Sequence, residues 1–211
     1  MIMEKQINIA SYLDSTYLKT ATEAGISEIE TKEIVINSIN EAIEANFACI
    51  MIRSEFIAIA KELIESSKSK LKVGTVIDFP FGNSTTKQKI AEGKLAIENG
   101  AYDIDYVCDY NAFKRGSFGK FDSDILEGTK IVLENKKIVK WIIETGALSA
   151  DEIKAIAKRI SKIVQFNFPK NANKVFIKTS TGYYGGFGAT VKDVKSIKSV
   201  AGNLQIKASG G

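Results

Sequence analysis

The sequence predicts an α/β protein built as a TIM-type (β/α)8 barrel of parallel strands. Strand-length apolar runs alternate with helical patterns along the 211 residues, which is typical of a parallel sheet. Most runs are near-continuous Val, Ile and Phe, as expected for strands that are covered on both faces. Polar residues lie within or at the carboxyl ends of many strands, where barrel enzymes place their active sites. The competing architecture, an open doubly wound sheet, lacks its usual GxGxxG or GxxxxGK[ST] marker.

Seven segments are expected to form the strands. They span residues 9–14, 47–52, 71–79, 102–108, 137–144, 174–180 and 204–209. Pro80 follows the third segment directly, where it removes no hydrogen bond from the sheet. The order along the chain therefore predicts one strand and one helix in alternation.

Sequence signals for the starts and ends of helices lie between these strands. Three pairs of an N-cap residue and an acidic residue three positions later mark helix starts: Ser27 with Glu30, Ser149 with Glu152, and Thr190 with Asp193. Further helices are expected over 55–66, from near 84 to Asn99, and over 124–135. Gly100 suits the left-handed position that ends the second of these.

The composition excludes several classes of site. The chain has no histidine and two cysteines, Cys49 and Cys108, each inside an apolar run. Histidine-based catalysis, a cysteine-rich zinc site and a disulfide scaffold are excluded, and a reducing cytoplasm is expected. No run approaches the roughly 18 apolar residues of a membrane span, and no signal peptide is expected. The net charge of +4 is spread over interleaved lysines and acids, so no nucleic-acid-binding face is expected.

Three lysines lie inside late apolar strands. They are Lys140 in IVKWIIE, Lys178 in VFIKTS and Lys207 in LQIKAS. Lysine is rarely buried without a partner, and burial together with a like charge favours the neutral amine. A neutral lysine attacks aldehydes and ketones to form a Schiff base. The alternative is that each lysine extends to a strand end and pairs with an acid.

Acidic residues in the same part of the chain suit such a site. Asp103 and Asp105 share one face of YDIDYV because side chains in a strand alternate. A carboxylate beside a lysine pair can hold a water or move protons during imine chemistry, or it can form a salt bridge with a buried lysine. Glu144, at the end of IVKWIIE, allows the same two interpretations, but the argument for a catalytic role is weaker.

Glycines gather where loops leave the late strands. They occur in Ser180-Thr181-Gly182, at Gly185, Gly186 and Gly188, and in Ser209-Gly210-Gly211. Backbone amides in such loops can bind a phosphate, and barrels place that site after strands seven and eight. Ordinary turns are the alternative.

Several segments together carry a family resemblance. They are YLDSTYLKTAT (12–22), VGTVIDFPFG (73–82), GAYDIDYV (100–107), KWIIETGAL (140–148), FIKTSTGY (176–183), GATVKDV (188–194) and KASGG (207–211). With these motifs, nearly the whole chain resembles deoxyribose-phosphate aldolase, a class I aldolase family on a TIM barrel. KTSTG on one strand followed by KASGG on the next is the most specific signal.

The resemblance implies roles for particular residues. Lys178 looks like the Schiff-base lysine, Lys207 like a second lysine that favours its neutral form, and Asp105 like the acid that relays protons. Lys140 looks like a further active-site residue that positions polar groups. Thr16, Gly182, Gly210 and Gly211 fall where the family binds its substrate, the glycines at the phosphate.

The reaction implied by the resemblance is the reversible cleavage of 2-deoxyribose 5-phosphate to glyceraldehyde 3-phosphate and acetaldehyde. It belongs to deoxyribonucleotide catabolism and requires no metal or cofactor. The expected partner is a small sugar phosphate, with neither nucleic acid nor membrane, and a homodimer is left open. Two alternatives stay open: another Schiff-base aldolase or transaldolase, and a non-catalytic truncated barrel.

The chain departs from the family pattern in three places. Ser15 stands where many relatives have histidine, and Met51-Ile52-Arg53-Ser54 replaces a segment with a short amide side chain. Arg53 therefore puts the contacts to the sugar hydroxyls in doubt. The seventh expected strand leads directly to Gly210-Gly211, and a full barrel has about 250 residues. We therefore expect residues 1–211 to form one barrel domain whose eighth β/α unit lies outside this chain.

Overall fold

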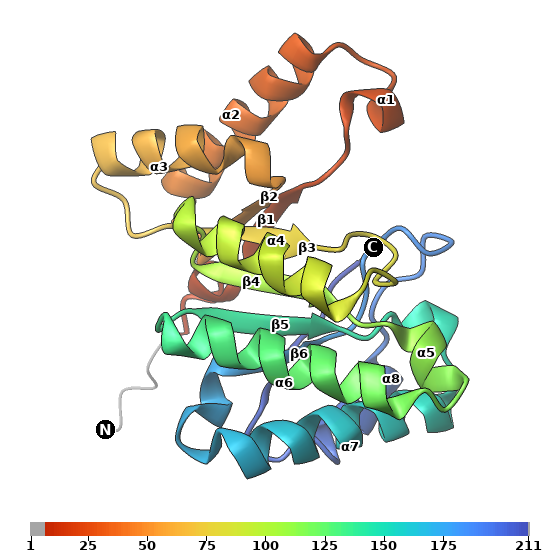
Figure 1. The fold of residues 1–211 in the computed structure, drawn as a ribbon. Coiled ribbons are helices and arrows are strands. Elements are labelled where there is room, and N and C mark those ends of the chain that lie inside the picture. The colour runs from red at the N-terminus through yellow and green to blue at the C-terminus, as the bar shows by residue number, and fades with distance from the viewer. Residues whose placement is uncertain (1–6, 211) are drawn as a thin grey trace. The chain divides into compact units, whose positions relative to one another are not determined.

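The computed structural model describes residues 7–210, which form two compact units. The first unit comprises residues 7–75 and 99–102, and the second comprises 76–98 and 103–210 (Figure 1). Helices follow strands in both units, and all the strand pairs described below are parallel. The predicted α/β class is therefore confirmed.

The first unit has three strands in chain order, β1 (Asp14–Tyr17), β2 (Cys49–Ile52) and the start of β3 (Lys72–Ile77). Its helices are α1 (Ala21–Ala24), α2 (Glu28–Glu44) and α3 (Ile57–Ser66), the last preceded by the 3₁₀ turn η2 (Ser54–Phe56). α2 begins at the predicted capping box. The Ser27 hydroxyl accepts a hydrogen bond from the Glu30 amide, and the Glu30 carboxylate accepts one from the Ser27 amide.

The predicted first strand, 9–14, is wrong over most of its length. Ile9–Tyr12 forms a 3₁₀ turn, η1, and the strand runs instead from Asp14 to Tyr17. The Asn8 side chain accepts a hydrogen bond from the Ala10 amide at 3.2 Å, which caps the turn locally. Ile9 and Tyr12 are both about 70% exposed, so no burial favours an extended strand there. The short helix α1 was not predicted, although Thr20 and Glu23 form a capping box before it.

The second unit has four strands in chain order. They are β4 (Asp103–Val107), β5 (Ile138–Ile142), β6 (Val175–Lys178) and β7 (Gln205–Lys207), each paired in parallel with the next. The last residues of β3 also belong to this unit. A doubly wound sheet reverses its strand order at a switch point. The uninterrupted order β4-β5-β6-β7 has no such reversal, and it fits the winding of a barrel.

The helices of the second unit pack against one another in the same order. These are α4 (Thr86–Glu98), α6 (Phe118–Glu134), α7 (Ala150–Asn167) and α8 (Val191–Lys198). Figure 1 shows α4, α6 and α7 running side by side along the strands. The helix predicted from residue 124 begins earlier, at Phe118, and a short helix α5 (Tyr110–Lys114) precedes it. The Asp109 side chain caps α5 by accepting from the Ala112 amide at 2.7 Å. Two further 3₁₀ turns are η3 (Thr145–Ala147) and η4 (Pro169–Lys174).

Aromatic side chains form the core of the second unit between β4, β5 and the helices. Tyr106 stacks on Trp141 with ring centroids 4.8 Å apart. Two helix glycines make room for these rings. A Cβ at Gly93 would lie 1.9 Å from the Tyr106 hydroxyl, and one at Gly128 would lie 2.8 Å from the Trp141 ring. Close backbone approach, rather than large apolar side chains, therefore packs α4 onto the core, and Leu95 is left exposed.

Candidate active site

The register of the second unit places the predicted lysines and acids on one face of its strands. Asp105 pairs with Lys140, and Lys178 pairs with Lys207. Lys140 pairs with Phe176, two residues before Lys178. Since side chains alternate along a strand and register partners point the same way, the three lysines and Asp105 share one face. Asp103 joins them, two residues before Asp105.

The charged side chains on this face contact one another directly. The Lys140 Nζ lies 2.5 Å from the Asp103 Oδ2 and 3.0 Å from the Asp105 Oδ1. The Lys178 Nζ lies 2.8 Å from the Asp105 Oδ2. All four of these residues are buried, and Lys207 is half-buried. Asp103 and Asp105 are therefore salt-bridge partners of buried lysines, and Asp105 bridges two of them.

This arrangement sets the charge state of Asp105. Burial alone would raise the pKa of the Asp105 carboxyl, because it penalises the charged form. The charges of Lys140 and Lys178 and their hydrogen bonds outweigh burial, so the pKa of Asp105 lies below its ordinary value. Asp105 is thus a carboxylate at neutral pH. Chemically, the cluster supplies a primary amine and a carboxylate in one buried site, a pair suited to imine formation and proton transfer.

Glu144 lies just beyond β5 and contacts the loop after β6. The Glu144 carboxylate accepts hydrogen bonds from the backbone amide and the hydroxyl of Thr181. Burial raises the pKa of Glu144, while the Thr181 hydrogen bonds and the Lys178 charge oppose that effect. Glu144 is therefore bound to the loop and not paired with a lysine as Asp105 is.

The glycine-containing loops after β6 and β7 lie against each other. The Ser209 hydroxyl donates to the Ser180 carbonyl at 2.7 Å, and the Ser209 amide donates to the Thr179 hydroxyl at 3.0 Å. Gly182 and Gly210 both have positive φ, +84° and +81°. A Cβ at Gly182 would meet only the Gly210 Cα, at 3.8 Å, so the two glycines are neighbours. Gly211, predicted to bind phosphate, lies outside the described residues.

The remaining predicted residues belong to the first unit. Thr16 lies on β1 and is exposed, Ser15 is half-buried, and Met51 is buried in β2. The Arg53 Nε donates to the Leu18 carbonyl at 2.8 Å, and its guanidinium lies 3.6 Å from the Glu23 carboxylate. Arg53 therefore has partners in its own unit.

Sequence reasoning missed a second buried ionic cluster, centred on Lys89 of α4. The fully buried Lys89 Nζ donates to the carbonyls of Gly82 and Val107, at 2.8 and 2.9 Å. It also lies 3.0 Å from Asp124 and 3.5 Å from Asp78. In the sequence, Lys89 sits among polar residues of a helix and looks like a solvent-exposed lysine. Only the glycine at position 93, one turn later, marks the buried face.

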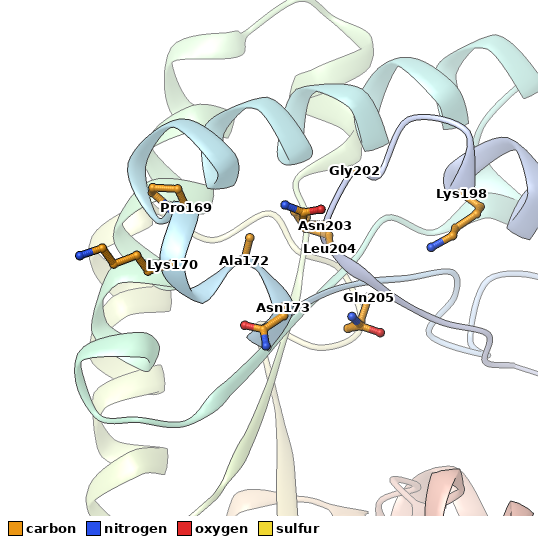
Figure 2. A pocket seen from close by; sticks show the side chains of 9 residues that line it. All are labelled: Pro169, Lys170, Ala172, Asn173, Lys198, Gly202, Asn203, Leu204 and Gln205. Carbon is orange, nitrogen blue, oxygen red and sulfur yellow. The ribbon is translucent and has the colours of Figure 1, made fainter. Parts of the chain in front are cut away.

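Other features of residues 7–210 do not compete with this site. A hollow of about 490 Å³ opens at the amino-terminal ends of β6 and β7 (Figure 2), with a largely polar lining of Pro169, Lys170, Ala172, Asn173, Lys198, Gly202, Asn203, Leu204 and Gln205. It contains none of the predicted site residues. Among the described residues, no three or more Cys, Asp or Glu side chains are arranged to hold a metal ion. None of the helices in the described part combines the length and apolar composition needed to cross a bilayer.

Comparison with known proteins gives consistent matches, although no family model matches the chain. The deoxyribose-phosphate aldolase of Staphylococcus saprophyticus is 41% identical over 206 residues, which cover 97% of this chain and 84% of that protein. The enzyme of the same name from Thermococcus gammatolerans is 36% identical, with the same coverage. Among solved structures, the aldolase QR15 has a TM-score of 0.78 at 29% identity, covering 98% of this chain and 83% of that one. The tetrameric deoxyribose phosphate aldolase of Aeropyrum pernix has a TM-score of 0.74 at 25% identity, covering 96% and 77%.

Proposed function

Since the chain belongs to the deoxyribose-phosphate aldolase family of lyases, we propose that it cleaves 2-deoxyribose 5-phosphate reversibly to glyceraldehyde 3-phosphate and acetaldehyde. The reaction proceeds through a Schiff base on Lys178. The observation that carries this proposal is the buried contact of 2.8 Å between the Lys178 Nζ and the Asp105 carboxylate, in register with Lys207.

Lys178 is the nucleophile in this proposal because of its position. It is the last residue of β6, directly before the Thr179–Gly182 loop that is proposed to bind the phosphate. Strands in a sheet are about 4.8 Å apart, and Lys207 is the register partner of Lys178 on the next strand. In the resting site the Asp105 carboxylate favours the ammonium form of Lys178, whereas the positive charge of Lys207 on the adjacent strand opposes that form and favours proton release before the attack.

The reaction then follows from imine chemistry. The neutral amine attacks the C1 aldehyde, water leaves, and the protonated imine draws electrons from the C2–C3 bond. Asp105, with Lys207 and a water, takes the C3 hydroxyl proton as that bond breaks and glyceraldehyde 3-phosphate leaves. The resulting enamine is protonated at C2, and hydrolysis of the imine releases acetaldehyde and restores Lys178.

The other charged residue of the cluster has a supporting role. The Lys140 ammonium contacts the carboxylates of both Asp103 and Asp105. This contact holds the Asp105 carboxylate in place beside Lys178. Gly182, Gly210 and Gly211 bind the phosphate through backbone amides. Positive φ at Gly182 and Gly210 supports this role, because side chains disfavour the backbone conformation that such loops adopt.

The proposal also covers the cellular compartment of the enzyme and its oligomeric state. We place the reaction in cytoplasmic deoxyribonucleotide catabolism, and we propose a homodimer, which the molecular mass in solution tests. One solved relative is described as tetrameric, so a mass corresponding to four copies is the alternative outcome.

Turnover of matched substrates tests the function. We expect release of acetaldehyde from 2-deoxyribose 5-phosphate and no cleavage of ketose phosphates. Lys178→Met is expected to abolish turnover, while Glu127→Gln, at an exposed residue of α6, leaves it unchanged. Preferential cleavage of ketose phosphates would instead support another class I aldolase.

A further inference from the structure

Glu144 has an unusual combination of backbone conformation and burial. It follows β5 with φ +57° and ψ 70°, in the left-handed region that residues other than glycine rarely adopt. It is 1% exposed. Strained backbone of this kind persists only where the surroundings hold it, and it is common at functional sites.

The Glu144 side chain uses this position to hold one residue of the neighbouring loop. Its carboxylate accepts from the Thr181 amide at 3.2 Å and, through a short hydrogen bond, from the Thr181 hydroxyl. Hydrogen bonds to a charged acceptor are stronger than those between neutral groups. Both Thr181 donors are therefore committed to one carboxylate.

The same threonine shapes the turn that follows it. The Thr181 hydroxyl oxygen accepts a hydrogen bond from the Tyr183 amide at 3.0 Å. Gly182, between them, has φ +84°. The Tyr183 ring packs edge-on against Phe79, with centroids 4.9 Å apart, which anchors the far side of the turn. A continuous chain of contacts therefore runs from Glu144 through Thr181 to the turn that contains Gly182.

We infer that Glu144 is a positioning residue that holds the Thr181–Tyr183 turn in the shape needed to bind the substrate phosphate. The inference rests on the proposed function, because it takes Gly182 as part of the phosphate site. Glu144 acts through Thr181 and contacts neither Lys178 nor Asp105 by a hydrogen bond in the described structure. Its loss is therefore expected to weaken phosphate binding and to spare imine formation.

The first test compares two substrates in Glu144→Gln, with Glu127→Gln as the matched control. The neutral amide keeps an acceptor oxygen but removes the negative charge that strengthens both hydrogen bonds from Thr181. We expect the KM for 2-deoxyribose 5-phosphate to rise about tenfold, while the KM for unphosphorylated 2-deoxyribose changes less than twofold. Borohydride trapping of acetaldehyde on the variant is expected to match wild type. An unchanged KM for the phosphorylated sugar, or equal increases for both sugars, would overturn the inference.

A second pair of variants covers the case in which Glu144→Gln fails to fold. Thr181→Val removes the hydroxyl and keeps its shape, whereas Thr181→Ser retains the hydroxyl. We expect Thr181→Val to reproduce the KM increase for the phosphorylated sugar and Thr181→Ser to restore the wild-type value. Equal KM values in the two variants contradict the role of the hydroxyl.

Amide hydrogen exchange separates failure of this inference from failure of the proposed function, because it needs no turnover. In Glu144→Gln, exchange at the Thr181 and Tyr183 amides is expected to accelerate at least tenfold. The Ala112 amide, capped by Asp109, serves as the internal control and is expected to keep its rate. Unchanged protection at Thr181 and Tyr183 would contradict the inference even in an active aldolase.

Discussion

Replacing Asp105 by Asn removes the one charge that faces two buried ammonium groups. Lys140 keeps Asp103 at 2.5 Å, whereas Lys178 loses the carboxylate at 2.8 Å. Breaking a buried ion pair costs about 3–5 kcal/mol of stability.

Denaturant unfolding at several pH values measures this effect. We expect Asp105→Asn to lose about 3–4 kcal/mol at pH 7. In acid the difference shrinks. The pKa of Asp105 is lowered in the folded protein, so its contribution is present above its unfolded pKa, about 3.9, and is lost as the pH falls through the folded pKa.

A second substitution tests the cause of that loss. Adding Lys178→Met removes the unpaired amine, and we expect the double variant to be more stable than Asp105→Asn alone. A loss below about 1 kcal/mol at pH 7, or a loss of about 3–4 kcal/mol that persists in the double variant, would show that the unpaired Lys178 is not the cause.

Two further predictions concern the other lysines. Lys207→Leu is expected to lower the rate and to move the acidic limb of the pH–rate profile to higher pH, because a neighbouring positive charge that favours the neutral amine is lost. A lower rate with an unmoved limb would instead assign Lys207 to proton transfer or binding. Lys89→Met removes the donor to the Gly82 and Val107 carbonyls, while Asp124 keeps Lys120 at 3.0 Å, so chemical unfolding is expected to show a loss of about 1–3 kcal/mol. The exposed control Lys87→Met is expected to stay within about 0.5 kcal/mol, and equal losses in the two variants would contradict the importance of the buried cluster.

The sequence was sufficient where a local signal and burial agreed. The Ser27 and Ser149 capping boxes mark the starts of α2 and α7 correctly. The apolar runs around Asp105, Lys140 and Lys178 are strands because both of their faces are covered. The side-chain alternation that placed Asp103 and Asp105 on one face holds in the structure, where both contact Lys140.

Features that depend on tertiary contacts were not predictable. Ile9 and Tyr12 form a strand-like apolar pattern, but both are exposed. The Asn8 side-chain cap stabilises a 3₁₀ turn there instead. Lys89 is buried because carbonyls and acids from outside its own helix meet it. Apart from Gly93, one turn later, no pattern in the sequence carries that information. The left-handed conformation of Glu144 likewise accompanies its contact with Thr181, 37 residues away.

The central claim, that Lys178 forms the Schiff base, is tested most directly by trapping the imine. The protein is incubated with acetaldehyde, reduced with borohydride, and mapped by peptide mass spectrometry. Reduction of an acetaldehyde imine converts the amine to an N-ethyl group, so we expect one ethyl group on the peptide that carries Lys178. Lys140 and Lys207 are expected to be unmodified, and Lys178→Met is expected to lose the label. An ethyl group on Lys140 or Lys207 with Lys178 unmodified would contradict the assignment.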